Sequence, residues 1–199
     1  GIKVDKIKKE YRLMEIRAAP EPTNDEMIVE GYAIRFNEPA VFDVFGKEYR
    51  EVIDPGALDG ADMRDVPFKY NHSDSVMIMA RTRNKTLELI PDENGLFIRA
   101  KLANTTAGRD LYELIRRGDI DKMSFAFTVA EDGDEYDRKT RTRTIKRIKK
   151  IWDVAAVDTP AYDTTSISAR SFFELESEKE REALERAERR KRLLIMTYF

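Results

Sequence analysis

The spacing of hydrophobic and polar residues predicts β-strands along most of this chain. Apolar residues alternate with polar ones, or form short apolar runs, in eight stretches: residues 11–17, 27–36, 47–53, 66–70, 86–90, 96–102, 123–129 and 140–157. A period of two places successive side chains on opposite faces of a strand, so each stretch can bury one face in a sheet. The turn Asp92-Glu93-Asn94-Gly95 joins two of them into a hairpin. The pattern favours an α+β fold with a mostly antiparallel β-barrel or sheet core and a few helices packed around it.

Helix signals occur in three places. Asp54-Pro55 offers an N-cap and a first helical residue, which predicts a short helix through Leu58. Residues 107–117 have an apolar stripe at helical spacing, and Gly118 follows as the stop signal. Residues 174–194 are acidic early and basic late, an order that complements the helix dipole and supplies i,i+4 ion pairs. This last segment has few apolar positions, so we expect a single exposed helix.

Composition divides the chain into three segments. Residues 1–10 form a basic leader, residues 11–172 contain the predicted strands, and residues 173–199 form a charged C-terminal helical tail. Hydrophobic residues make up 41% of the 199 residues, which is enough to build a core in the middle segment. Charged residues make up 37%, well above the usual quarter, so part of the chain is expected to be solvated and without a core.

Charge and cysteine content argue against several classes of function. The net charge of −2 gives no general attraction to nucleic acid or to a membrane surface, and no apolar run is long enough to span a bilayer. The absence of cysteine excludes thiol chemistry and disulfide bonds. His72 is the single histidine, so a zinc site of the usual ligand type is not expected, and the sequence implies no cofactor.

The stretch from Met123 to Val129 has the most informative alternation. Met123, Phe125, Phe127 and Val129 share one face, which is expected to be buried, whereas Ser124, Ala126 and Thr128 share the other. The small residues on the second face leave space above Ser124 for a reacting group. The alternative is that this face is simply the solvent side of a half-buried strand.

A nucleophilic serine needs a base, and the usual base is a histidine held by an acid. Because His72 is the only histidine, any such mechanism must use it. It lies in the polar turn Asn71-His72-Ser73-Asp74 at the end of a predicted strand, where a catalytic side chain can be both fixed and accessible. The alternative for His72 is an ordinary surface histidine in a turn.

Asp153 is the candidate acid from strand register. The acidic residues 131–137 are expected to form a solvated loop, and if the strands that end at Val129 and begin at Thr140 pair as a hairpin centred near Asp137 or Arg138, the paired residue numbers sum to about 275. Ser124 then lies beside residues 151–153, and Asp153 is the one ionisable residue in the apolar run from Ile151 to Val157. A carboxylate there needs a partner, because burying an unpaired charge is costly. That partner could be His72, or a lysine or arginine in a salt bridge.

The chain also contains a set of short motifs in a recognisable order. They are Glu30-Gly31-Tyr32-Ala33, Phe36-Asn37, Ile53-Asp54-Pro55-Gly56-Ala57-Leu58, Asn71-His72, Asp92-Glu93-Asn94-Gly95-Leu96, Gly118-Asp119-Ile120, Met123-Ser124-Phe125-Ala126-Phe127, Trp152-Asp153-Val154 and Thr159-Pro160-Ala161. Each motif is weak alone, but their order and spacing are specific. In them, over residues 14–169, the chain resembles the prohead proteases of tailed bacteriophages, which are capsid-maturation serine proteases related in fold to the herpesvirus assemblins.

The resemblance implies a serine endopeptidase of mixed β-barrel and helix architecture, with residues 11–172 as its catalytic domain. Such proteases are packaged inside the immature capsid, or prohead, in the cytoplasm of the bacterial host. There they cleave segments of scaffold and capsid precursor proteins and finally digest themselves. The implied partners are these polypeptide substrates and, by analogy to the assemblins, a second copy in a homodimer, with no nucleic acid or membrane.

Carried over by position, Ser124 is the nucleophile, His72 the general base and Asp153 the third catalytic residue. The family more often has Glu before Val-Ser, whereas the run here is Asp153-Val154-Ala155. The shorter side chain reaches less far, so Asp158 and Asp74 stay open as alternative acids.

Two alternatives concern the whole protein and its tail. A non-catalytic β-barrel assembly or structural protein of a phage could keep the same fold without the chemistry, because fold does not guarantee function. The tail could dock on scaffold or shell protein, be removed by self-cleavage, or be a solvated helix without a specific partner.

Overall fold

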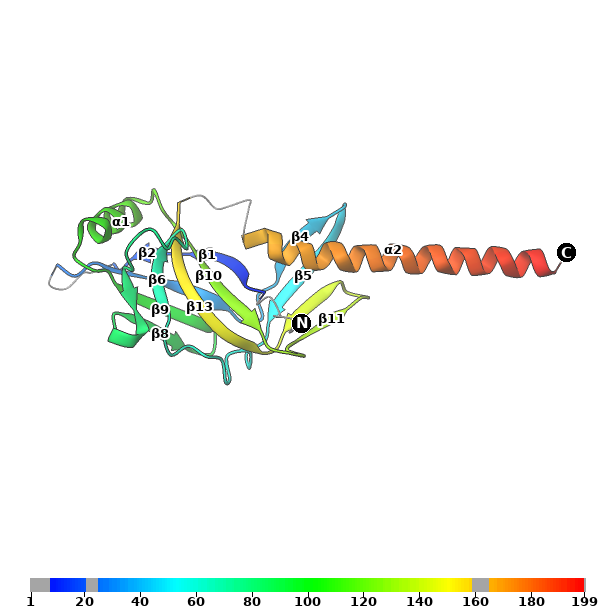
Figure 1. Cartoon of the computed structure of the whole chain (residues 1–199), viewed down its shortest axis with the longest axis horizontal. Coiled ribbons are helices and arrows are strands. Elements are labelled where there is room, and N and C mark those ends of the chain that lie inside the picture. Colours follow the sequence, from blue (N-terminus) through cyan, green and yellow to red (C-terminus); the bar gives the residue numbers. More distant parts are fainter. Residues whose placement is uncertain (1–7, 21–24, 159–164, 199) are drawn as a thin grey trace, which may run out of the picture.

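A computed structural model describes residues 8–20, 25–158 and 165–198. Over these residues the protein has an α+β fold of three sheets, two α-helices and one short 3₁₀ helix, η1 (Thr82–Asn84) (Figure 1). Residues 1–7 of the predicted leader and the Thr159-Pro160-Ala161 motif lie outside the described residues.

The first sheet is the centre of the fold. It has five strands in the order β1-β10-β13-β6-β7, and β13 and β6 run parallel, whereas the other neighbours are antiparallel. Their bounds are β1 (Glu10–Glu15), β10 (Lys122–Val129), β13 (Ile148–Val157), β6 (Pro67–Tyr70) and β7 (Ala80–Arg81). The predicted large face of β10 is confirmed as core, because Met123, Phe125 and Phe127 are all buried.

The second sheet has the order β2-β3-β9-β8 and contains the predicted hairpin. Its strands are β2 (Arg17–Ala18), β3 (Ile28–Arg35), β9 (Gly95–Lys101) and β8 (Leu87–Pro91). Its apolar side chains share one hydrophobic cluster with those of β10 and β13. A Cβ on Gly31 would lie 2.4 Å from the backbone oxygen of Glu15, so only glycine lets β3 approach β1 this closely.

The third sheet corrects two predictions. Its order is β11-β12-β5-β4, with bounds β11 (Asp134–Asp137), β12 (Thr142–Ile145), β5 (Lys47–Ile53) and β4 (Ala40–Val44). The predicted loop 131–137 is therefore partly a strand, because its residues pair with β12. The predicted single strand 140–157 is wrong, since the chain breaks between Ile145 and Ile148. There the backbone N–H groups of Lys146 and Arg147 donate to Gly133, and β12 turns to pair in parallel with β5.

None of the three sheets closes into a barrel, which corrects the barrel expectation. Closure requires an unbroken ladder of backbone hydrogen bonds around the ring. Here β1 is an edge of the first sheet, and it faces β5 and β12 of the third sheet through ion pairs between side chains. Side chains therefore join these two sheets where a barrel would have a backbone ladder.

One predicted helix is confirmed and one is wrong. Helix α1 (Thr106–Arg117) has Thr105 as its N-cap, accepting a hydrogen bond from the backbone of Gly108, and Gly118 ends it with φ +85°. The segment predicted as a helix from Asp54 to Leu58 is a series of turns. The segment is too short for its hydrogen bonds to offset the cost of helix nucleation. Gly60, with φ +83°, has a left-handed backbone conformation that does not continue a right-handed helix.

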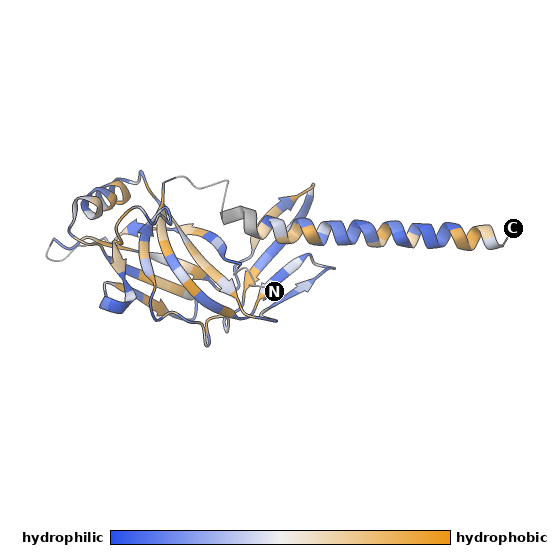
Figure 2. Cartoon of the chain, viewed as in Figure 1, coloured by the Kyte–Doolittle hydropathy of each residue, from blue (hydrophilic) through white to orange (hydrophobic). Residues whose placement is uncertain are grey.

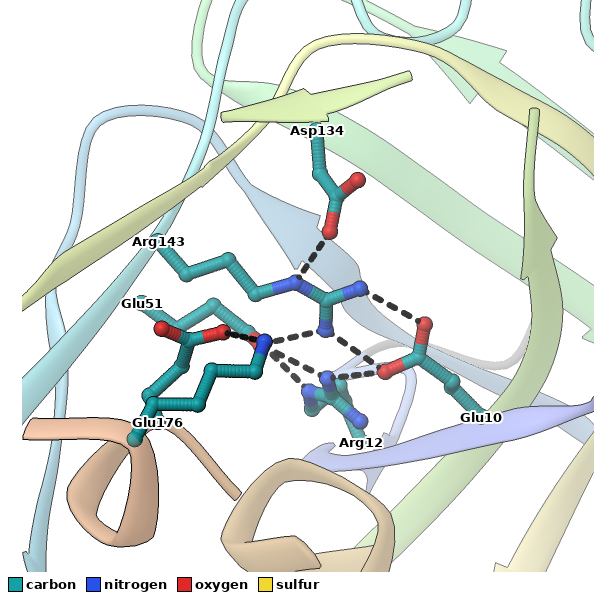
Figure 3. A network of polar contacts seen from close by, with 7 residues as sticks. Glu10, Arg12, Glu51, Asp134, Arg143 and Glu176 are labelled. Carbon is teal, nitrogen blue, oxygen red and sulfur yellow. Dashed lines mark hydrogen bonds and ion pairs between the residues drawn. The ribbon is translucent and has the colours of Figure 1, made fainter. Parts of the chain in front are cut away.

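A buried ion cluster lies between the first and third sheets (Figure 3). Arg12 of β1 contacts Glu51 of β5 at 2.5 and 2.7 Å and Glu10 at 2.9 Å. Arg143 of β12 contacts Glu10 at 2.7 Å, Glu51 at 3.2 Å and Asp134 of β11 at 2.7 Å. Four of these side chains are at most 9% exposed: Glu10, Arg12, Glu51 and Arg143. Each of their charges is therefore compensated by its neighbours rather than by water.

Helix α2 (Thr165–Thr197) packs near its start against β1 of the first sheet and β4 of the third, and then leaves the body of the protein (Figure 1). Phe173 is fully buried, with its ring centroid 5.1 Å from that of Tyr49 and 5.5 Å from that of Phe42. Every described residue from Arg181 onward is exposed. Figure 2 shows mainly hydrophilic residues along this outer part and an apolar group near its end. The exposed charged helix is as the sequence predicts, although it begins earlier than residue 174.

The ion cluster predicts a loss of stability in acid. Burial alone would raise the pKa of Glu10, but the hydrogen bond from Arg143 and the charges of Arg12 and Arg143 hold the pKa below the usual value for a glutamate. A carboxylate with a lowered folded-state pKa contributes stability above its unfolded pKa and loses that contribution as the pH falls through the folded value. Glu10→Gln should therefore show a smaller drop in Tm than wild type between pH 6 and pH 3, measured by calorimetry. An equal drop in both proteins would contradict this assignment.

Candidate active site

Ser124 lies in the middle of the first sheet, in a row of residues that crosses four strands. Leu13 of β1, Ser124 of β10, Ala155 of β13 and Lys69 of β6 are successive register partners. Register partners share a face of a sheet. The alternative interpretation, that this face is simply the solvent side of a half-buried strand, is wrong, because Ser124 and Ala126 are 0% exposed and Thr128 is 7% exposed.

His72 reaches this face from the turn after β6. Asn71 and His72 both have positive φ, at +50° and +52°, a conformation that is uncommon for residues other than glycine. The turn brings the imidazole back over the sheet, where Nδ1 forms a hydrogen bond with Asp153 Oδ1. The ring of Tyr11 meets it edge to face, with centroids 5.0 Å apart. His72 is therefore held on two sides and is not an ordinary surface histidine.

Asp153 lies on the strand next to Ser124, but the register differs from the prediction. Ser124 pairs with Ala155, two to four residues beyond the expected partners, and Asp153 pairs with Ala126. Strands β11 and β12 extend the hairpin, and the pairing of β10 with β13 shifts twice where β13 has an extra residue, at Trp152 and at Lys149. Asp153 and Ser124 are consequently diagonal neighbours on one face of the sheet. Residues in such positions are about 7–8 Å apart. This distance leaves space for the imidazole of His72 between the two side chains.

Two atoms at this site are buried without a hydrogen-bond partner. Within the described residues, neither Ser124 Oγ nor His72 Nε2 has an acceptor or donor in reach. Such atoms are rare in folded proteins, because an unsatisfied buried polar group costs stability, and each one calls for an explanation. Both atoms belong to residues that the sequence selected as candidate catalytic residues.

The two alternative acids are engaged elsewhere. Asp158 Oδ2 accepts a hydrogen bond of 2.5 Å from the hydroxyl of Tyr70. Asp74 pairs with Lys69 at 2.7 Å, and its side chain is 92% exposed. Among the described residues, Asp153 is the carboxylate that contacts His72.

Two further residues, one beside Asp153 and one beside His72, were not identified from the sequence. Lys69 Nζ is 4.0 Å from Asp153 Oδ2, and its side chain is 17% exposed. Tyr11 contacts His72, and its pKa is raised, first by burial and then by the charge of Asp153. Alternation along β1 and β6 predicts which face of its own strand each side chain lies on. Only the order of strands in the sheet shows that both side chains lie near His72 and Asp153.

A groove begins beside this site, on the β1 side. It has a volume of about 390 Å³, and it is lined by Leu13, Met14, Glu15, Tyr32, Arg35, Glu38 and Lys122. Leu13 is the register partner of Ser124, and Lys122 lies two residues before Ser124 on the same face. An extended peptide lying over Ser124 could therefore place a side chain in this groove.

No helix among the described residues is long and apolar enough to cross a membrane. The described residues also contain no group of three or more histidine, cysteine or acidic side chains arranged to hold a metal ion.

Comparison with known proteins identifies the family. No curated protein and no solved structure matches the chain significantly. A family model described as the caudovirus prohead serine protease matches residues 13–180, which include Ser124, His72 and Asp153. Because this match covers most of the chain, the protein belongs to the caudovirus prohead serine protease family.

Proposed function

We propose that this protein is a serine endopeptidase in which Ser124 is the nucleophile, His72 the general base and Asp153 the acid that orients the base. Membership of the family indicates a capsid-maturation protease that acts inside the phage procapsid on capsid or scaffold proteins. We further propose that the enzyme cleaves its own chain at the end of maturation.

The proposed reaction follows the usual course for a Ser-His-acid set. Ser124 Oγ attacks the carbonyl carbon of the scissile bond while His72 Nε2 accepts the hydroxyl proton. The tetrahedral intermediate collapses, the C–N bond breaks, and the imidazolium gives its proton to the leaving amine. Water then attacks the acyl-ester while His72 accepts one of its protons. The bond between the carbonyl carbon and Ser124 Oγ breaks, the imidazolium returns the proton to Oγ, and the new carboxyl end is released.

The observation that carries this proposal is the contact of His72 with Asp153. The hydrogen bond from Nδ1–H to the carboxylate leaves Nε2 with its lone pair, which is the tautomer that a general base requires. The unpartnered hydroxyl of Ser124 on the same sheet face supports the same assignment. Because Ser124 is fully buried, a peptide can reach Oγ only when the groups above the sheet move.

A fluorophosphonate probe tests the nucleophile directly, since it forms a covalent adduct only with an activated serine. We expect an adduct on Ser124, located by mass spectrometry of the digested protein, and labelling about 10⁴-fold slower in His72→Ala. Ser73→Ala removes a hydroxyl from the turn beside His72 and should label as wild type does. A folded wild-type protein that acquires no adduct at Ser124 would support the non-catalytic assembly protein instead.

A further inference from the structure

Lys69 is a partly buried cation next to the carboxylate that contacts His72. We propose that Lys69 is a positioning residue, whose charge keeps Asp153 ionised and His72 in its neutral, Nδ1-protonated form. The consequence for catalysis rests on the proposed function. The effect of Lys69 on His72 does not, because it follows from the charges alone.

The two oxygens of Asp153 have different neighbours. Oδ1 is bonded to His72 Nδ1, whereas Oδ2 lies 4.0 Å from Lys69 Nζ. Among the described residues, Lys69 and His72 are the two basic side chains in salt-bridge range of Asp153. The carboxylate is 11% exposed, so its charge is poorly compensated by water and needs a nearby cation.

The second partner of Lys69 does not account for its position. Lys69 also contacts Asp74 at 2.7 Å, but the Asp74 side chain is 92% exposed. An ion pair with a solvated partner contributes little and is screened by salt. The contact with Asp153 involves two partly buried side chains, 17% and 11% exposed, so it is screened less by water and salt than the contact with Asp74.

The pairing of β6 with β13 positions the ammonium group of Lys69 near Asp153. Lys69 is the parallel register partner of Ala155, and Asp153 lies two residues before Ala155 on the same face of β13. Alanine at position 155 is small, so the lysine side chain has space to reach the neighbouring carboxylate. Lysine is a compact charge on a flexible stem, which suits an electrostatic contact without a fixed hydrogen-bond geometry.

The charged and titratable groups around His72 come from three elements and a turn. They are Tyr11 of β1, Asp153 of β13, Lys69 of β6 and Asp74 in the turn after β6. The tyrosine is neutral, and Asp74 is largely in water. With Lys69 in place, the charge of Asp153 is balanced by the ammonium group. Without it, the carboxylate is balanced best by an imidazolium ion, and a protonated His72 cannot accept the proton of Ser124.

The single histidine makes this inference measurable. In protein labelled with ¹⁵N-histidine, the two ring nitrogens report the tautomer and charge of His72 without any other signal. We expect the His72 signals of Lys69→Met to show a larger imidazolium fraction than those of wild type at the same pH. Fluorophosphonate labelling of Lys69→Met should be slower by about tenfold near neutral pH and should approach the wild-type rate in alkaline buffer.

Two further variants separate charge from structure. Lys69→Arg keeps the charge and should keep both the wild-type ¹⁵N signals and a labelling rate within about threefold. Asp74→Asn removes the exposed partner of Lys69 and should resemble wild type in both measurements. If Lys69→Met does not fold, Lys69→Gln is measured in the same way.

Identical His72 signals in wild type and Lys69→Met would overturn the proposal, whether or not the protein is a protease. A loss in Asp74→Asn as large as that in Lys69→Met would also overturn it, because the surface ion pair would then be the cause. A shift of the His72 signals in a protein that never labels at Ser124 would support the role of Lys69 and contradict the proposed function.

Discussion

Replacing Ser124 with alanine is expected to lower the rate of peptide-bond cleavage by about 10⁶-fold, because a Ser-His-acid set acts as a unit and loses nearly all its rate without the nucleophile. The same change should not destabilise the protein. Ser124 Oγ is buried without a hydrogen-bond partner, so its removal relieves an unsatisfied polar group. We therefore expect a Tm that is unchanged or about 2–4 °C higher.

Intact mass over time, together with calorimetry, checks both parts of this prediction. Wild type should shorten and Ser124→Ala should not, and the fragment masses will show where the chain is cut and whether α2 is removed. Thr128→Val removes a hydroxyl from the same face of β10 and should cleave at nearly the wild-type rate. Equal shortening of wild type and Ser124→Ala would mean that another residue or a contaminating protease cuts the chain.

Replacing Arg143 with methionine is expected to lower the free energy of unfolding by about 3–5 kcal/mol, because it breaks a buried ion cluster by removing one partner. Arg143 contacts Glu10, Glu51 and Asp134, and its side chain is 6% exposed. Without it, Glu10 and Glu51 share the single arginine Arg12, and Asp134 loses its contact with the guanidinium group. For a chain of this size the change corresponds to a fall in Tm of roughly 6–20 °C.

Denaturant unfolding and calorimetry can measure this loss against a surface control. Arg186→Met breaks an ion pair of 3.4 Å with Glu182 on α2, where the arginine side chain is 77% exposed. That variant should stay within about 0.5 kcal/mol of wild type. The double variant Glu10→Gln, Arg143→Met should be less destabilised than the sum of the single changes, because both act on one cluster. A loss below about 1 kcal/mol in Arg143→Met would mean that the cluster does not hold the two sheets together.

Local patterns in the sequence were sufficient to predict the elements whose structure is set by residues within the element or directly beside it. The alternation from Met123 to Val129 gave the core face of β10, and Gly118 marked the end of α1. The turn before Gly95 predicted the hairpin of β8 and β9. Periodicity and turn residues act within a few positions along the chain, so one sequence is enough to identify them.

The candidate site was predicted in part. Ser124, His72 and Asp153 were selected from the sequence, and the structure brings His72 to Asp153. Their catalytic roles stay a prediction that the labelling and cleavage experiments test. The predicted register of β10 against β13 was wrong, because bulges and the additional strands β11 and β12 cannot be located from alternation alone.

Sequence alone determined the family resemblance, the strand faces, α1 and the exposed charged helix. Only the tertiary structure decided the register of β10 against β13, the open sheets, the ion cluster and the place of Lys69. Arg12, Glu51 and Arg143 look like ordinary polar residues of separate strands, and each becomes buried only because β1, β5 and β12 meet. Contacts of this kind depend on pairing between residues far apart in the chain, and such pairing leaves no local periodic signal.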